Sequence, residues 1–533
     1  MSMPSLFVRC AVLFFLANAP LQAQNWPQGS GPNGNWKVDG KNPPTSWSVS
    51  TGENVAWRTP LPESGQGSVI AWENRLFVTS NVPWKESSKS EDNQKRKGPM
   101  GTDIVGYCLD AKSGKILWQV TLKGTRLKLY GGPFSDSTAP SPITDGKYVW
   151  FFNVSGMIGC YDFDGNEIWT HSWTPRGIMA NRQFEPLLVR DVILNIEVLD
   201  KSTVLDKRSL VDNDMVKKLK SERGNRNYFT FIHAYDKLTG KLKWISEAST
   251  STHSASCLGK SKNGELVLLH VRGGGHHPIE TPKGLSLTSL APGSEGKTLW
   301  NYELNTGSEY THQLTPKYAT WWVKGHHVVI DIATGKKLRK QPLNTPASVR
   351  NYDVNKAEYV SGGNSVKLNG KVTTHYSNLT VGDHHYFRTF SPFMVGRVHL
   401  ETGQTEYLQV PVQIVREDGS EKEFRWRKPI IQNDTRNSRG IDVGIADKRS
   451  KGNGWGHISA APPVAVGSIL YIPTMIGTSY VIDTSAETLD EKALLSVNDL
   501  GPAGKTWTLS SFSYANGRLY HRTMKEVICI GAR

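Results

Sequence analysis

A recurring hairpin pattern restricts this chain to repeat folds. In its clearest copy, YCLDAKSGKILWQVTL (107–122), a short apolar run ends in Asp110, a Gly-containing turn follows, and a second run carries Trp118. The pattern returns at 160–173 and 233–247, and in weaker form at 289–304, 329–343 and 398–410. Each copy predicts two strands joined by a turn. Because one hairpin cannot bury its own apolar face, the copies must pack against each other.

The spacing of the copies predicts a propeller, since units of several short strands recur every ~40–60 residues. The last unit, within 506–531, has only three strands, whereas ENVAWRTPL (53–61) is one strand without a unit. Joining the two closes the ring and leaves no open sheet edge. We therefore predict an all-β, eight-bladed propeller of four-stranded antiparallel blades. Seven blades is the alternative, if the crowded unit at 312–335 is only an elaboration.

The N-terminal residues predict export. Arg9 precedes the apolar stretch 10–19, and small residues up to Ala23 offer a cleavage site, so 1–23 is expected to be a secretory signal peptide. The stretch is shorter than the ~18–20 apolar residues that a membrane span needs. The mature protein is therefore predicted to be secreted or periplasmic, with no transmembrane segment. No Cys follows the apolar stretch, so no lipid anchor is expected.

The mature chain is predicted to be one domain. Residues 24–52, rich in Gly, Pro and Asn, are expected to form an extended lead-in that wraps over the propeller of residues 53–533. If strands A to D run outward from the channel in each blade, the A–B and C–D turns are tight and emerge at one end. The long insertions are D–A or B–C connections at the other end: 81–102, 199–227, 271–284, 344–374 and 413–456. Such one-sided elaboration predicts a binding face.

Cysteines are expected to be structural here. Cys108, Cys160 and Cys529 stand at matching places in their repeats, so they belong to different blades. They are predicted to be small buried residues that pack strand against strand. Neither a disulfide nor a Cys-ligated metal is expected.

The formal charge of +15 favours acidic partners, such as uronic or sulfated glycans or anionic cell-wall polymer. Nucleic acid is not an expected partner, because the chain shows no helical or zinc-finger recognition motif and is predicted to be exported. Charge that serves only solubility remains the alternative interpretation. Oligomeric state leaves no signal in the sequence.

Histidines gather where inner strands begin. His253, His312, His375 and His457 each stand at or just before a predicted A strand of blades four to seven. Neutral imidazoles that converge on the channel mouth suit a divalent transition metal or acid–base catalysis. His276 and His277 in the Gly-rich B–C loop of blade four are weaker metal candidates. The alternative is that these rings are channel-lining polar groups bonded to backbone and water. His384 and His385 are assigned to an A–B turn at the opposite end.

Further candidates lie in the long connections of the same face. Arg can hold a carboxylate or sulfate through two parallel hydrogen bonds, and aromatic rings stack on sugars. The predicted ligand-binding residues are Arg176, Arg182, Arg436, Arg439, Asp136 and Trp455, and Tyr310 joins the four histidines as a catalytic candidate. A solvated loop surface is the alternative for each.

The repeats resemble the pyrroloquinoline-quinone (PQQ) type, with LDAKSGKILW (109–118) as the clearest match. The opening NWPQGSGPNGN (25–35) also resembles secreted bacterial PQQ-like propellers. The resemblance covers nearly all of the mature chain and implies an eight-bladed propeller related to quinoprotein alcohol dehydrogenases and the outer-membrane assembly lipoprotein B. One fold hosts many functions, so the resemblance specifies the fold better than the function.

Three functions follow from these patterns. The first is a non-catalytic extracytoplasmic propeller that binds an anionic ligand or partner on the loop face. The second is a metal-dependent lyase or hydrolase acting on acidic polysaccharide through the histidines. The third is a PQQ-dependent dehydrogenase. PQQ is the least expected cofactor, because the resemblance implies an adjacent Cys–Cys pair and a matching calcium set, and neither is found.

Overall fold

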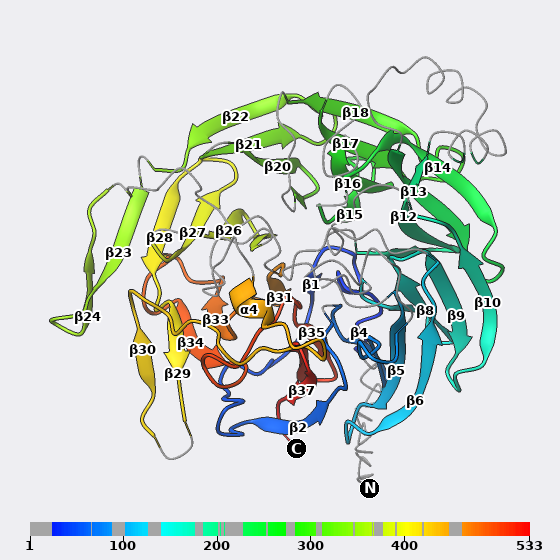
Figure 1. The fold of residues 1–533 in the computed structure, drawn as a ribbon. Helices are drawn as coiled ribbons and strands as arrows, with labels where there is room; N and C mark the ends of the chain where they lie inside the picture. The colour runs from blue at the N-terminus through cyan, green and yellow to red at the C-terminus, as the bar shows by residue number, and fades with distance from the viewer. Residues whose placement is uncertain are drawn as a thin grey trace, which may run out of the picture.

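The structure, a computed structural model, is a closed ring of β-sheet blades around a channel (Figure 1). It describes residues 24–65, 67–87, 102–125, 140–175, 185–200, 203, 207, 228–251, 254–272, 283–304, 312–323, 325–344, 347–364, 366, 377–389, 392–417, 420–446 and 461–532. The predicted signal peptide lies outside these ranges. Within them, no helix has the length and apolar character needed to cross a membrane.

The first four blades are four-stranded antiparallel sheets in sequence order. Blade 1 holds β3 (Ile70–Trp72), β4 (Arg75–Asn81), β5 (Ile104–Asp110) and β6 (Ile116–Leu122). Blade 2 holds β7 (Ile143–Thr144), β8 (Tyr148–Asn153), β9 (Met157–Asp162) and β10 (Glu167–Ser172). Blade 3 holds β11 (Leu187–Val189), β12 (Val192–Asp200), β13 (Tyr228–Asp236) and β14 (Leu242–Ser249). Blade 4 holds β15 (Cys257–Lys260), β16 (Leu266–Arg272), β17 (Gly284–Ser289) and β18 (Thr298–Glu303).

The remaining blades include the crowded fifth unit. Blade 5 holds β19 (Gln313–Leu314), β20 (Tyr318–Val323), β21 (His326–Asp331) and β22 (Lys337–Pro342). Blade 6 holds β25 (Asn378–Val381), β26 (His384–Arg388), β27 (Met394–His399) and β28 (Thr405–Gln409), and blade 7 holds β31 (Val464–Val466), β32 (Ile469–Pro473), β33 (Thr478–Asp483) and β34 (Leu494–Asp499). Blade 8 combines β35 (Ser513–Ala515), β36 (Arg518–Arg522) and β37 (Glu526–Ile530) with β2 (Val55–Pro60). Eight blades and the predicted closing strand are confirmed, and the seven-blade alternative is excluded.

The Gly and Trp of the repeat dock one blade onto the next. The indole N–H of Trp118 in blade 1 donates to the Phe163 carbonyl of blade 2, at 2.8 Å. Trp57, Trp169 and Trp300 make the equivalent bond to the following blade. The turn glycine lies under the preceding Trp: a Cβ at Gly240 would come within 2.7 Å of the Trp169 ring, and its φ is +67°. The repeat therefore encodes the blade interface as well as the hairpin.

The predicted role of the cysteines is confirmed. In the C strands, Cys108, Cys160 and Cys529 lie directly opposite Trp118, Trp169 and Trp57 of their D strands. All three are buried free thiols, as is Cys257 on β15. A small side chain opposite each Trp leaves space for the ring to reach the next blade.

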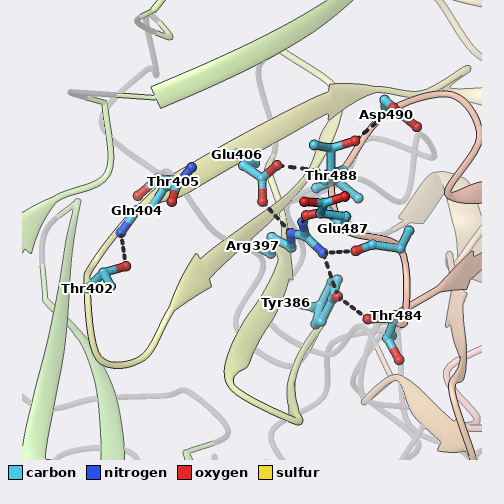
Figure 2. Close-up of polar contacts among 12 residues, drawn as sticks. Tyr386, Arg397, Thr402, Gln404, Thr405, Glu406, Thr484, Glu487, Thr488 and Asp490 are labelled. Carbon is cyan, nitrogen blue, oxygen red and sulfur yellow. Dashed lines mark hydrogen bonds and ion pairs between the residues drawn. The ribbon is translucent and has the colours of Figure 1, made fainter.

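Blade 6 replaces this pair with charged groups. Arg397 on β27 lies opposite Glu406 on β28, and their side chains form an ion pair of 2.5 Å. Figure 2 shows the guanidinium between Tyr386, Glu406 and the loop after β33. Its Nη1 and Nη2 donate to the Ala486 and Glu487 carbonyls of blade 7 at 2.9 and 2.6 Å. The guanidinium thus takes over the docking that an indole N–H performs elsewhere.

Two insertions form additional strands. In the predicted connection 344–374, β23 (Ala347–Asp353) pairs in parallel with β28, and β24 (Glu358–Ser361) pairs with β23. Blade 6 therefore has six strands, and the added hairpin projects beyond the rim at the left of Figure 1. In the connection 413–456, β29 (Gln413–Val415) and β30 (Glu423–Arg425) form a hairpin, and α4 (Val443–Ala446) is a single turn.

The first part of the lead-in enters the channel instead of covering the outside. We call residues 24–41 the plug. It includes β1 (Lys37–Val38), which pairs in parallel with β31 near the centre of Figure 1. The plug forms hydrogen bonds with the inner strands of blades 1 to 4 through Ala71, Thr144, Leu188 and Leu258. Gln24 reaches Asn516 in the A–B turn of blade 8. The plug therefore fills the channel at the A–B turn end and leaves the loop face as the other end.

Candidate functional site

Most of the predicted site residues lie outside the part of the chain that the structure describes. These are His253, His276, His277, His375, His457, Asp136, Arg176, Arg182, Tyr310 and Trp455. His312, Arg436 and Arg439 are described. Convergence of the four histidines on the channel mouth therefore stays a prediction, and the described residues contain no group of three or more His, Cys, Asp or Glu that could hold a metal ion.

His312 is a buried imidazole with no hydrogen-bond partner among the described residues. It stands immediately before β19, is 1% exposed, and stacks on Trp321 with ring centroids 4.2 Å apart. Both ring nitrogens are buried and lack a partner in the part of the chain that the structure describes. Burial lowers the pKa of His312 to about 3, so the ring is neutral at physiological pH. The unprotonated nitrogen of a neutral imidazole can bind a metal ion or accept a hydrogen bond.

The prediction that His384 and His385 lie in an A–B turn is wrong. His384 and His385 belong to strand β26, not to the preceding turn. The ring of His385 bonds to Asn378 through Nε2 at 2.9 Å and to His327 of blade 5 through Nδ1 at 3.0 Å. The sequence could not show this pairing, because it depends on how blade 6 packs against blade 5.

Arg436 lines a pocket on the loop face, which we call the Arg436 pocket. Its volume is about 410 Å³, and it lies above blade 8 between the 413–456 connection, the segment before β35 and the β36–β37 turn. The lining residues are Arg58, Pro60, Asp434, Thr435, Arg436, Pro502, Lys505, Thr506, Trp507, Thr523, Met524, Lys525 and Glu526. Backbone bonds from Asn433 and Asp434 to the Gly504 carbonyl hold the connection over this blade.

Positive charge predominates in the Arg436 pocket. Arg58 is neutralised by Glu526 through two bonds of 2.8 Å, and this pairing raises the pKa of Arg58. Arg436, Lys505 and Lys525 are exposed at the pocket, opposed there only by Asp434 among the remaining lining residues. Trp507 is 2% exposed, and its indole N–H is buried with no hydrogen-bond partner among the described residues. The pocket therefore offers cations to an anionic, oxygen-rich ligand.

Arg439 has a different environment from Arg436. Its guanidinium lies over the Trp84 ring at 4.1 Å, and burial lowers the pKa of Arg439. The backbone N–H of the neighbouring Ser438 donates to the Glu63 carboxylate at 2.8 Å. The Ser438 hydroxyl accepts a hydrogen bond from the backbone N–H of Trp84 at 2.7 Å. Arg439 therefore joins the long connection to the B–C loop of blade 1, and a direct role in ligand binding stays a prediction.

Sequence reasoning missed two buried arginines near the same face. Arg388 and Arg522 are each the last residue of a five-residue B strand, β26 and β36, and each is 0% exposed. Burial lowers the pKa of Arg388 to about 10, although Tyr480 opposes the shift. Arg522 requires Gly65, since a Cβ there would lie 1.8 Å from its Nη1. An Arg-Thr pair ends both apolar strands and was the available signal.

The cysteines do not fit the quinone site that the dehydrogenase resemblance implies. Cys108, Cys160, Cys257 and Cys529 lie in blades 1, 2, 4 and 8. Because these thiols lie in four different blades, they cannot form the adjacent Cys–Cys pair that the resemblance implies. Any chemistry on the loop face would come from its histidines, arginines and lysines.

Comparisons with known proteins support the propeller assignment. A family model described as outer membrane protein assembly factor BamB matches residues 101–373. No curated protein matches the chain. Quinohemoprotein alcohol dehydrogenase from Comamonas testosteroni is similar in structure, with a TM-score of 0.51 at 10% identity, covering 96% of this chain and 81% of that chain.

Two further solved structures are similar to the chain. A europium-containing methanol dehydrogenase gives a TM-score of 0.49 at 12% identity and covers 96% of this chain and 98% of that chain. BamB from Moraxella catarrhalis gives a TM-score of 0.32 at 12% identity and covers 92% of this chain and 95% of that chain. At such low identities, structural likeness bears on the fold alone.

Proposed function

The chain belongs to the family described as outer membrane protein assembly factor BamB, and from that premise we propose an extracytoplasmic propeller that binds an acidic glycan or another anionic partner on its loop face. Residues 1–23, predicted as a signal peptide, support a place outside the cytoplasm. The formal charge of +15 supports an acidic partner.

The Arg436 pocket carries this proposal. Arg436, Lys505 and Lys525 come from three separate loops and meet at one cavity, next to the buried Trp507. Long cationic side chains there can attract a carboxylate or sulfate from solution, and a guanidinium can hold it with paired hydrogen bonds. No chemical step is needed for this role.

Binding of an acidic oligosaccharide tests the proposal. Calorimetric titration with oligogalacturonate should show an affinity that falls as salt rises, because the contacts are ionic. The triple variant Arg436→Gln/Lys505→Gln/Lys525→Gln should bind at least about tenfold more weakly, since hydrogen bonds to charged groups contribute about 1.5–3 kcal/mol each.

The matched control removes equal charge from the opposite end of the ring. Lys112→Gln/Lys241→Gln/Lys336→Gln changes exposed lysines at C–D turns and should bind as the wild type does. If both triple variants lose affinity equally, binding depends on net charge and the pocket assignment is wrong. If neither loses affinity, the loop face is not the binding site.

A second function is favoured by His312. Its neutral ring has both nitrogens without partners among the described residues, as a metal ligand would before binding. We keep as the second candidate a metal-dependent lyase or hydrolase of acidic polysaccharide, with His253, His375 and His457 completing the site. Elemental analysis should then find stoichiometric zinc, manganese or nickel that His312→Ala loses. Absence of metal from the wild type would contradict this candidate.

A further inference from the structure

A second cavity lies at the opposite end of the channel, between the plug and the inner strands of blades 3 to 6. We call it the plug pocket, and its volume is about 590 Å³. Its lining includes amides of the plug, leucines of blades 3 to 5, and the basic residues Lys37, Arg190 and Lys260. This size suits a ligand comparable to a small metabolite or one sugar unit.

Every charged residue that lines the plug pocket is basic. Lys37 comes from the plug, Arg190 from the A–B turn of blade 3 and Lys260 from the end of β15. No Asp or Glu is among the lining residues. The Arg436 pocket, by comparison, contains two carboxylates, one of them paired with Arg58. The plug pocket is therefore the more uniformly positive of the two.

Lys37 is the residue that points most directly to an anionic ligand. Its ammonium makes one hydrogen bond in the described chain, to the Thr380 hydroxyl at 3.3 Å, and no carboxylate lies within ion-pair distance. Burial lowers the pKa of Lys37, with Cys257 opposing the shift. An ammonium group has three donors, and Lys37 is half-buried, so water can solvate its charge only in part. A bound anion would supply the missing charge and acceptors.

Neighbouring groups hold Lys37 and Arg190 at the pocket. Asn33 and Asn35 hold the plug turn through bonds to the Lys37 carbonyl and N–H at 3.1 and 3.2 Å. The Arg190 guanidinium reaches the Leu290 carbonyl of blade 4.

We propose that the plug pocket is a binding site for a small oxyanion, carrying a carboxylate or phosphate, that pairs with Lys37, Lys260 and Arg190. The leucines of blades 3 to 5 would contact the body of the ligand, and the amides of the plug would accept or donate hydrogen bonds to its hydroxyls. This site is separate from the loop face, so it stands whether or not the Arg436 pocket binds glycans.

Titration of the full mature protein with inorganic phosphate and with glucuronate tests the site, with glucose as the neutral control. Either anion should raise the melting temperature in proportion to its binding, since it binds the folded state. The two anions distinguish a phosphate ligand from a carboxylate ligand. Lys37→Met should weaken binding of the preferred anion at least about tenfold, and Lys260→Gln should weaken it less.

Two control variants show whether anion binding depends on the plug pocket and not on positive charge in general. Lys147→Gln removes an exposed lysine from the A–B turn of blade 2 at the same end, and Lys112→Gln removes an exposed lysine from the C–D turn of blade 1. Both should bind the anion as the wild type does. Unchanged anion binding in Lys37→Met, or no binding of either anion by the wild type, would overturn the proposal.

Discussion

At the residue scale, most blade interfaces in the described chain contain a donor that reaches the C–D turn of the next blade. Trp57, Trp118, Trp169 and Trp300 supply an indole N–H. In blade 5 the position holds Arg339, whose guanidinium donates to the Glu401 and His399 carbonyls of blade 6. In these five blades the position holds a long side chain with an N–H at its tip.

Replacing one docking Trp tests this interpretation. Trp118→Phe keeps most of the ring but removes the N–H that donates to Phe163, so the free energy of unfolding should fall by about 1 kcal/mol more than ring shrinkage alone requires. Urea denaturation measures the difference. Trp244→Phe is the control, because Trp244 packs on Gly296 of blade 4 without an indole hydrogen bond in the described chain. Equal losses in both variants would show that the indole bond contributes nothing.

At the element scale, the plug connects blades that the repeat alone would join only to their neighbours. It bonds to inner strands on opposite sides of the channel, from Ala71 in blade 1 to Leu258 in blade 4 and β31 in blade 7. Trp26 and Trp36 are at most 1% exposed, so the plug also contributes to the core. Loss of its fit should therefore destabilise several blades together.

A glycine in the plug provides a test of this fit. Gly34 has φ of +64°, and a Cβ there would lie 2.4 Å from Leu258 Cδ1. Gly264 has φ of +82° with no atom within 4 Å of a Cβ. Gly34→Ala and Gly264→Ala share the cost of a left-handed backbone, about 1–2 kcal/mol. Overpacking should add about 1–3 kcal/mol for Gly34→Ala alone, measured as a lower urea midpoint. Matching midpoints would contradict a close-packed plug.

At the scale of the whole molecule, neutral histidines are buried or half-buried across three consecutive blades. Burial is the main cause that lowers the pKa of each: to about 4 for His270 and His384, to about 3 for His312 and His327, and well below the usual value for His385. The unfolded chain takes up protons near pH 6.5, whereas the folded protein resists them until about pH 4 or below. The contribution of these histidines to stability is therefore complete above pH 6.5 and is lost as the pH falls toward 4.

Acid denaturation tests the direction of this pH dependence and whether the buried histidines cause it. The free energy of unfolding should stay level from pH 8 to 7 and decline between pH 6.5 and 4.5, by about 1.4 kcal/mol per pH unit for each fully titrating group. His270→Gln keeps a hydrogen-bonding group for Thr288, which lies 2.8 Å from the His270 ring, and should reduce the slope by up to one proton. Parallel curves for wild type and His270→Gln would contradict the assignment.

The sequence predicts the ring well because its pattern is local. Asp, Gly and Trp at fixed spacing specify each C–D hairpin, and the unmatched strand at 53–61 specifies the closure. The position of the plug follows no period and depends on contacts with seven blades, so no local pattern reveals it. Arg436 was predicted for the loop face, but Lys505, Lys525 and Trp507 join it only because three loops meet above blade 8. The pairing of His327 with His385 likewise depends on how two blades pack.

The closure of the ring also fixes the order in which this protein can reach its native state. The bond from Gln24 to Asn516 joins residues 492 positions apart, and β2 pairs with β37, the last strand of the chain. The plug and β2 are made first, yet their partners in blades 7 and 8 are made last. These early residues must therefore wait, with Trp26, Trp36 and Trp47 exposed, until synthesis is nearly complete. So late a contact predicts slow maturation and dependence on a chaperone that shields the amino-terminal residues.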